Sequence, residues 1–154
     1  MILDELAAYA SFRVAEAKKK IAADEMERKA RSLPTGDFRF EHALCNTGVS
    51  FICEVKRASP SKGLIAEDFP YVKIAREYEQ AGADCVSVLT EPKWFLGSDE
   101  IFKEIRAAIT LPMIRKDFTV DAYQIYEAKC MGADAVLLIC ALLPTETIRE
   151  YLKI

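Results

Sequence analysis

From residue 49 onward, short apolar runs alternate with stretches whose apolar residues recur at helical spacing. The runs are rich in β-branched and aromatic residues, and they predict four strands, at about 49–56, 85–89, 112–115 and 135–139. The stretches between them predict helices at about 70–81, after Ser98, at about 122–131 and from near Pro144. Near-continuous apolar strands that alternate with helices are typical of a parallel sheet that helices cover on both faces.

One short pattern occurs twice. Residues 81–86 read Ala-Gly-Ala-Asp-Cys-Val, and residues 131–136 read Met-Gly-Ala-Asp-Ala-Val. In both copies a helix is expected to end at the glycine, and a strand to start after a tight turn. A repeated module of this kind favours an α/β fold of the (β/α) TIM-barrel type over an open doubly wound sheet. No G-x-G-x-x-G follows the first strand, which further disfavours a dinucleotide-binding fold.

Residues 1–47 predict a helical extension that precedes the strands. A helical pattern covers 3–33 and stops at Pro34, and Phe38, Phe40 and Leu44 suggest a short second helix or packed turn. We therefore expect a single domain over 1–154, with the extension at 1–47 and four βα modules at 48–154.

The number of modules predicts half of a barrel. A complete barrel has eight modules in about 250 residues, whereas four strands are expected here and the last segment is an amphipathic helix without a C-cap signal. We interpret the chain as an N-terminal half-barrel, either a fragment or a truncated product. The outer strands of a half-barrel have open edges, which favour pairing with another chain, so we expect a homo-oligomer.

Composition excludes several functional classes. The net charge of -3 argues against nucleic-acid binding, and no apolar run reaches the ~18 residues of a membrane-spanning helix. The N-terminus does not resemble a signal peptide. The five cysteines are odd in number and lack C-x-x-C spacing, so we expect them to be reduced and mostly buried in a cytoplasmic protein. With His42 as the only histidine, neither a His-based triad nor a multi-histidine metal site is available, and no metal is expected.

Charged residues follow three of the predicted strands. They are Glu54 and Lys56 after the first, Glu91 and Lys93 after the second, and Lys116 and Asp117 after the third. The carboxyl ends of barrel strands meet at one mouth, where lysines suit an anionic substrate and can act as general acids. The alternative is that these residues form solvated salt bridges at the rim, which we favour for Lys93. We favour function for Lys56 and Lys116, which lie at or just past their strand ends.

Three aromatic residues accompany these strand ends. Trp94, Phe95 and Phe118 can form a wall for a planar ligand, or they can pack their loops. Both interpretations remain open at the level of the residues alone.

Several segments together resemble the indole-3-glycerol phosphate synthase family. They read Ile-Cys-Glu-Val-Lys-Arg-Ala-Ser-Pro-Ser-Lys-Gly at 52–63, Ser-Val-Leu-Thr-Glu at 87–91, Phe-Leu-Gly-Ser at 95–98, Leu-Pro-Met-Ile-Arg-Lys-Asp-Phe at 111–118, Tyr-Gln-Ile-Tyr-Glu-Ala at 123–128 and Gly-Ala-Asp-Ala-Val-Leu-Leu-Ile at 132–139. The resemblance covers nearly the whole chain. It implies a reaction of tryptophan biosynthesis without metal or cofactor. In this reaction 1-(2-carboxyphenylamino)-1-deoxyribulose 5-phosphate closes an indole ring and releases carbon dioxide and water.

The resemblance also implies roles for individual residues. Lys116 is the general acid, Lys56 pairs with the substrate carboxylate and donates a proton during dehydration, and Glu54 orients both lysines. The residues expected near the substrate are Arg57 and Ser59, with Pro60, Phe95, Phe118 and Leu137 forming the aryl pocket. Leu96 departs from the polar residues also found at its position in the family. The family's remaining site residues lie on strands five to eight, so we expect this chain alone to be inactive or nearly so.

Two other functions fit the same residues. A barrel enzyme of another kind would use Lys56 or Lys116 to form a Schiff base with a carbonyl substrate. A non-catalytic half-barrel would bind a phosphate ligand or a complementary half.

Overall fold

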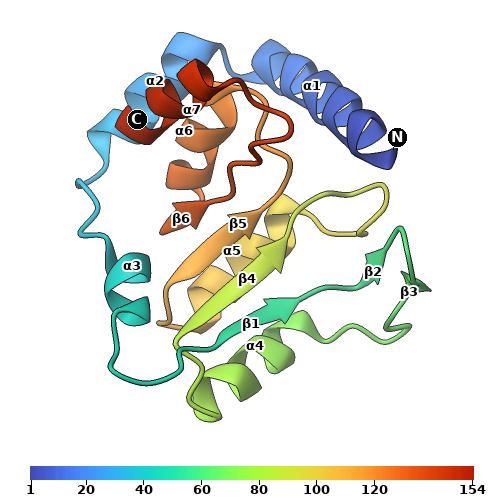
Figure 1. Cartoon of the computed structure of the whole chain (residues 1–154), viewed down its shortest axis with the longest axis vertical. Helices are drawn as coiled ribbons and strands as arrows, with labels where there is room; N and C mark the ends of the chain where they lie inside the picture. The colour runs from blue at the N-terminus through green and yellow to red at the C-terminus, as the bar shows by residue number, and fades with distance from the viewer.

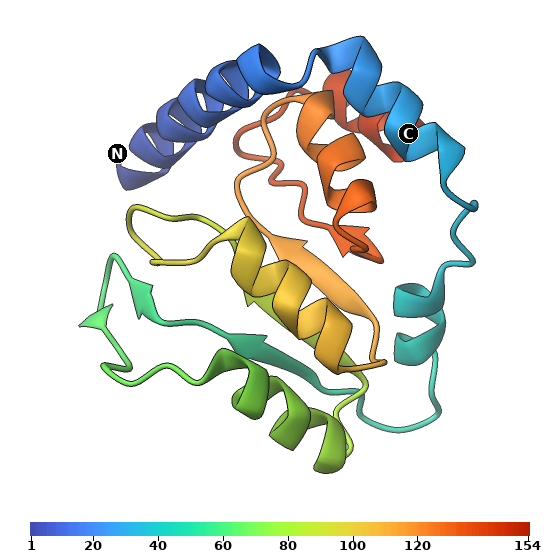
Figure 2. The ribbon, with the colours of Figure 1, turned by 180° about the vertical axis from the view of Figure 1, so that it is seen from behind.

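A parallel four-stranded sheet forms the centre of the computed structural model, which describes all residues 1–154. Its strands follow the chain order and are β1 (Ile52–Val55), β4 (Cys85–Leu89), β5 (Met113–Lys116) and β6 (Ala135–Val136). Helices α4 (Tyr71–Gln80) and α5 (Asp99–Ala108) lie along one face, as Figure 2 shows. The main core lies between this face and the helices, and its fully buried members include Val86, Val88, Phe102, Ile105 and Met113.

The opposite face of β1, β4 and β5 has no helix lying along it (Figure 1). The expectation of helices on both faces is therefore wrong for this part of the sheet. The reason lies in the side chains of the open face, which include Glu54 on β1 and Lys116 on β5. These charged groups face one another, as side chains do in the interior of a barrel, and need no apolar cover.

The N-terminal extension consists of three helices instead of one long and one short helix. They are α1 (Ile2–Lys20), α2 (Ala23–Ser32) and α3 (Arg39–Leu44). Helix α1 ends because Ile21 adopts an extended conformation. Val14 of α1 and Met26 of α2 pack in a small core with Tyr123 of α6 (Ala122–Cys130), which attaches the extension to the barrel modules.

The repeated pattern forms the same structure twice. Gly82 and Gly132 follow α4 and α6 with φ angles of 85° and 84°, a conformation that glycine adopts at low cost. The aspartates of the two copies bond to the start of the neighbouring segment, Asp84 to the Phe51 amide at 2.7 Å and Asp134 to the Met113 amide at 2.8 Å. The predicted sequence of helix end, glycine and strand start is confirmed, and the aspartate fixes adjacent segments to each other.

Several boundaries differ from the sequence expectations. β1 is shorter than the apolar run that predicted it, and β6 pairs over two residues, so residues 137–139 lie outside the ladder. The loop after β1 contains a hairpin of β2 (Ala58–Ser59) and β3 (Gly63–Leu64), which turn residues alone did not predict. The last helix is α7 (Thr145–Lys153). None of the helices has both the length and the apolar character that a membrane span needs.

The cysteines are mostly not buried, contrary to expectation. All five are free, but only Cys85 is buried, while Cys45, Cys130 and Cys140 are exposed and Cys53 is intermediate. The three exposed residues lie at the ends of helices or in a turn, outside the packed face of the sheet. Their side chains are therefore not buried in the core.

Candidate active site

One carboxylate joins two lysines at the carboxyl ends of two strands. Glu54 Oε1 accepts a hydrogen bond from Lys56 Nζ at 2.5 Å, and Glu54 Oε2 accepts one from Lys116 Nζ at 3.1 Å. β1 and β5 flank β4, so this contact spans three strands. Ser87 of β4 pairs in register with Glu54, and Leu89 of β4 pairs in register with Lys116.

The cluster carries excess positive charge and remains partly accessible. The side chains of Glu54, Lys56 and Lys116 are 30%, 32% and 36% exposed. Partial burial alone would raise the pKa of Glu54, but the hydrogen bonds and charges of the two lysines outweigh it and lower the pKa below its ordinary value. An ionised Glu54 between two ammonium groups leaves one net positive charge, which suits an anionic ligand. A simple salt bridge at one strand end would not require the lysine from β5.

The hairpin after β1 holds the next three predicted residues. Arg57 fixes the hairpin through its carbonyl, which accepts bonds from Ile65 and Ala66, while its guanidinium has only a 3.5 Å contact to the Glu67 carbonyl. Ser59 is buried, and its hydroxyl accepts a bond from the Lys62 amide at 3.3 Å. Pro60, at the tip, is exposed. None of these residues bonds to Glu54 or the two lysines.

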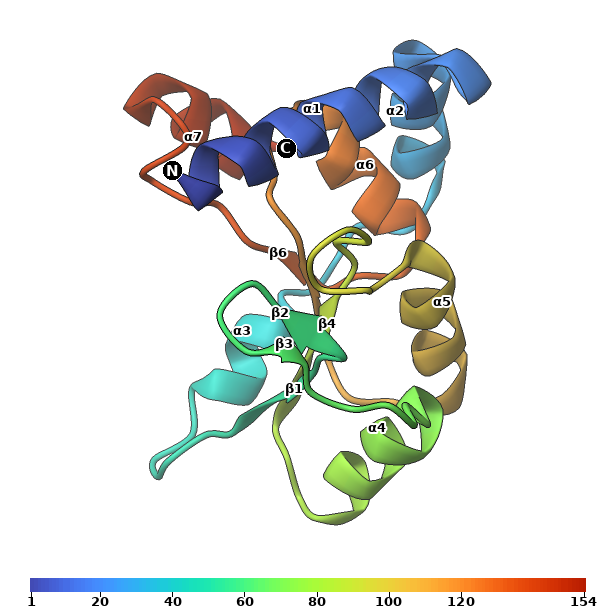
Figure 3. The same ribbon diagram turned by 90° about the vertical axis from the view of Figure 1, so that its right-hand side faces the viewer.

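Two of the three predicted aromatic residues meet. The rings of Phe95 and Phe118 lie 6.1 Å apart at an interplanar angle of 41°. Trp94 turns away and packs edge-on against Tyr9 of α1, with ring centroids 5.7 Å apart. Figures 1 and 3 both show α1 beside the loop that follows β4. Phe95 and Phe118 therefore form an aromatic pair, whereas Trp94 attaches the loop to the extension.

Two other predicted positions have different outcomes. Lys93 forms no salt bridge, so the favoured interpretation of a salt bridge at the rim is wrong for this residue. Its ammonium instead lies over the Trp94 ring, 4.3 Å from the ring centroid. Leu137 is half-buried just beyond the end of β6, and Phe118 follows β5, the strand with which β6 pairs.

Glu91 has a role that the sequence did not reveal. The sequence predicts a charge at the barrel mouth, but Glu91 is fully buried. Its carboxylate accepts bonds from the amides of Lys93, Trp94 and Phe95 at 2.9, 2.7 and 3.0 Å. One sequence signal could have indicated this role. Glu91 is an acidic residue at the start of a loop, and the amides that follow it need hydrogen-bond acceptors.

Asp117 likewise points away from the mouth. Its carboxylate accepts bonds from Arg13 of α1 at 3.0 and 2.6 Å, from the Thr90 hydroxyl at 2.8 Å and from the Phe118 amide at 2.8 Å. Burial alone would raise the pKa of Asp117, but these bonds and the charges of Arg13 and Arg115 lower it below its ordinary value. No sequence signal connects Arg13 to this position.

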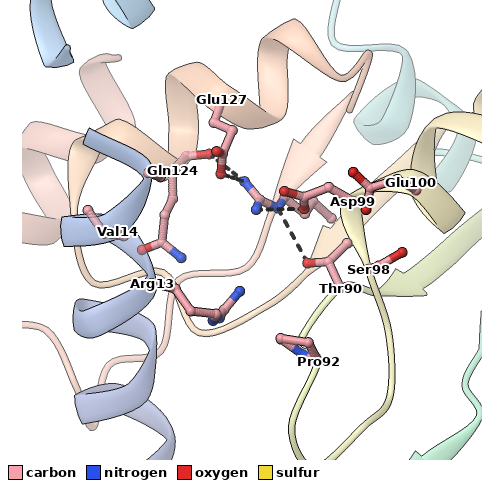
Figure 4. Close-up of a pocket in the computed structure, with 11 residues that line it drawn as sticks. Arg13, Val14, Thr90, Pro92, Ser98, Asp99, Glu100, Gln124 and Glu127 are labelled. Atoms are coloured by element: carbon pink, nitrogen blue, oxygen red, sulfur yellow. Dashed lines mark hydrogen bonds and ion pairs between the residues drawn. The ribbon is translucent and has the colours of Figure 1, made fainter. Parts of the chain in front are cut away.

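Behind Asp117 lies a polar cavity of about 220 Å³. Arg13, Asp99 and Glu127 surround it in Figure 4. Arg115 crosses it and bonds to Asp99 at 2.9 Å and Glu127 at 2.8 Å. Arg13, Arg115, Asp99 and Glu127 all take part in salt bridges, so we assign this cluster to the support of the strand ends.

Residues 3–154 match the family model described as indole-3-glycerol phosphate synthase. Proteins of that name from Ruminiclostridium cellulolyticum, Endomicrobium trichonymphae and Lachnoclostridium phytofermentans are 53%, 49% and 42% identical over 100%, 99% and 100% of this chain. The chain covers 60%, 60% and 61% of these relatives, so it spans about three fifths of their length. Because the family model matches nearly every residue, the chain belongs to the indole-3-glycerol phosphate synthase family.

Proposed function

We propose that these residues form part of an enzyme that closes an indole ring. The substrate is 1-(2-carboxyphenylamino)-1-deoxyribulose 5-phosphate, and the products are indole-3-glycerol phosphate, carbon dioxide and water. The observation that carries this proposal is the bridge from Glu54 to Lys56 and Lys116, at 2.5 and 3.1 Å. Such a cluster supplies two ammonium groups to a substrate that has a carboxylate and a ketone.

Lys116 acts as the general acid of ring closure. The aryl carbon that bears the carboxylate attacks the ketone carbon, and the ketone oxygen receives a proton from the Lys116 ammonium as the new carbon–carbon bond forms. The carboxylate then leaves as carbon dioxide, and its bonding electrons restore the aromatic ring. Glu54 holds Lys116 towards the interior of the mouth, where this oxygen would lie.

Lys56 serves the steps that involve the carboxylate and the hydroxyl. Its ammonium pairs with the substrate carboxylate before decarboxylation and later donates a proton to the departing hydroxyl, which leaves as water while the ring loses a proton. The contact with Glu54 at 2.5 Å keeps the ammonium at the strand end. Arg57 and Ser59 lie in the hairpin beside it and would cover the substrate.

Phe95 and Phe118 bind the aryl ring, with Pro60 and Leu137 completing the pocket. Their mutual distance of 6.1 Å supports a shared apolar wall. We further propose, from the resemblance alone, that no cofactor or metal takes part and that the reaction takes place in the cytoplasm.

The test is a steady-state assay of indole-3-glycerol phosphate formation by the purified chain. We expect little or no turnover from the chain alone, and restored turnover after it is mixed with the C-terminal part of a relative. Restored activity that depends on Lys116 supports the proposal. Trapping of a carbonyl substrate by borohydride on either lysine would instead indicate a Schiff-base enzyme. Absence of turnover in the mixture, with a correctly assembled complex, would reject the enzymatic function.

We also propose that the isolated chain forms a homo-oligomer through its two sheet edges. Near β1, Val49, Phe51 and Ile52 expose 80%, 59% and 48% of their surface. Near β6, a largely apolar groove of about 590 Å³ lies between α2, α6 and α7. Light scattering should give a mass above that of one 17.3 kDa chain, and a monomer mass would contradict the proposal.

A further inference from the structure

The loop that carries Phe95 is folded around one buried carboxylate. Glu91 is fully buried at the end of β4, and the next residues turn back over it. Its Oε1 accepts the Lys93 amide, and its Oε2 accepts the amides of Trp94 and Phe95. Three consecutive amides therefore point at one side chain, which makes the path of the loop depend on that side chain.

The ends of the loop are closed by the backbone. The Gly97 amide donates to the Glu91 carbonyl at 2.9 Å, and Leu96 adopts a left-handed φ of 53° to allow this turn. The carbonyl of Phe95 accepts a bond from the Ala58 amide at 3.2 Å, which connects the loop to the β2–β3 hairpin. These contacts hold the backbone at Phe95, whose ring lies beside that of Phe118.

The arrangement requires a side chain with two acceptor oxygens, which a carboxylate has and its amide lacks. A carboxylate accepts at both oxygens, whereas a glutamine amide has one acceptor and one donor group. With its oxygen in the Oε2 position, a glutamine would place its NH₂ group against the Lys93 amide, which now lies 2.9 Å from Oε1. Two donors would then face each other in a site that water does not reach.

We propose that Glu91 is a positioning residue for the aryl group of the substrate, because it places the Phe95 ring against Phe118. This inference rests on the proposed function, since the Phe95 ring would contact the aryl group of the proposed substrate. Glu91 forms no hydrogen bond with Glu54, Lys56 or Lys116, and its own hydrogen bonds all go to the loop.

Steady-state kinetics of Glu91→Gln test this proposal in the enzyme form that turns over. We expect KM to rise about tenfold, the equivalent of one lost hydrogen bond, with a smaller change in kcat because both lysines remain. Phe95→Ala should raise KM similarly, and the double variant should not exceed the larger single effect. The control is Glu100→Gln, an exposed carboxylate on α5, which should match the wild type. A wild-type KM for Glu91→Gln, or fully additive effects, would overturn the proposal.

A second measurement separates this inference from the proposed function and from misfolding. Trp94 is the only tryptophan and lies in the loop, so its emission reports the loop in the 154-residue chain without any assay of activity. In Glu91→Gln we expect a red-shifted emission and faster hydrogen exchange at residues 93–95, with unchanged exchange in β4 and β5. Unchanged emission and exchange would overturn the inference even if the enzyme is active. If the wild type shows no turnover in any form, the proposed function fails, and an unaltered loop would reject the role of Glu91 as well.

Discussion

Arg13 and Asp117, which lie 104 positions apart, form a two-point salt bridge with donor–acceptor distances of 3.0 and 2.6 Å. Asp117 lies between Lys116 and Phe118, the proposed general acid and one wall of the aryl pocket. The bridge therefore joins α1 to the segment that carries both groups. The N-terminal extension thus contributes to the position of the candidate site, although none of its residues bonds to the lysine cluster.

Arg13→Ala should destabilise the folded chain by about 1.5–3 kcal/mol, the range for a hydrogen-bonded charge that loses its partner. The Asp117 side chain is 2% exposed and would keep Thr90 and the Phe118 amide as its remaining close donors. Urea unfolding monitored by circular dichroism measures the change. Arg28→Ala, an exposed residue of α2, is the control and should have little effect. Equal midpoints for the two variants would contradict the stabilising role of the bridge.

The lowered pKa of Asp117 predicts a specific loss of stability in acid. Because the pKa of the folded state lies below that of the unfolded state, the unfolded chain binds the proton first as pH falls. The stabilisation is complete above the unfolded value of about 3.9 and disappears as pH falls through the folded value.

Unfolding free energies of the wild type and Asp117→Asn, measured from neutral pH into acid, test this sign. The difference between the two proteins should be largest near neutrality and shrink as pH falls below the unfolded-state pKa. Asp68→Asn, at an exposed position, should run parallel to the wild type. A difference between Asp117→Asn and the wild type that grows towards low pH would refute the assignment.

The sequence could predict that site residues at the ends of strands lie together, because parallel strands bring their carboxyl ends to one edge of the sheet. Glu54 and Lys116 meet for this reason, although 62 positions separate them. Arg13 and Glu91 could not be predicted. The partner of Arg13 is fixed by how α1 packs on the sheet, and the partners of Glu91 are backbone amides, which every residue carries.

Some features of the fold could likewise be predicted from the sequence, and others could not. Repeated Gly-Ala-Asp turns and apolar runs predicted the order and direction of the strands, since these depend on local pattern. The break of the extension at Ile21 and the hairpin after β1 depend on backbone conformations that many residues can adopt. The prediction that the cysteines are buried was also wrong, because three of them lie at helix ends or in a turn, where a small apolar side chain can be exposed.

Lys116→Met should lower kcat by about 10²–10⁴-fold, the usual contribution of a general acid. The Lys116–Glu54 pair is partly exposed, so the free energy of unfolding should change by less than about 1 kcal/mol. The assay uses the chain alone or combined with the C-terminal part of a relative, whichever turns over. Lys103→Met, on the exposed side of α5, is the matched control. A variant at position 116 with near wild-type kcat would exclude Lys116 as the acid.

Asp134→Ala should destabilise the chain more than Asp84→Ala, although both occupy the same place in the repeat. Asp134 accepts bonds from the buried Met113 amide and from Arg106, at 2.8 and 3.2 Å. Asp84 accepts bonds from two exposed groups, the Phe51 amide and the Asn46 side chain. We expect a loss of about 1–3 kcal/mol for Asp134→Ala, since a buried donor loses its acceptor and water replaces it poorly. Denaturant midpoints of the two variants give the comparison, and the reverse order would contradict it.

Gly97→Ala should disturb the loop of Phe95 through the backbone alone. A Cβ at this position would lie 2.1 Å from the Leu89 carbonyl oxygen and 2.7 Å from its carbon, and neither atom can move without displacing the end of β4. Overpacking of this kind costs about 1–3 kcal/mol or more. Gly48→Ala is the control, because its Cβ would meet nothing within 4 Å. Gly48→Ala should leave stability unchanged or slightly higher, since alanine restricts the unfolded chain. Urea midpoints measure both effects, and Trp94 emission should shift only in Gly97→Ala. If Gly97→Ala matches its control in both measurements, the close approach of the loop to β4 does not exist in solution.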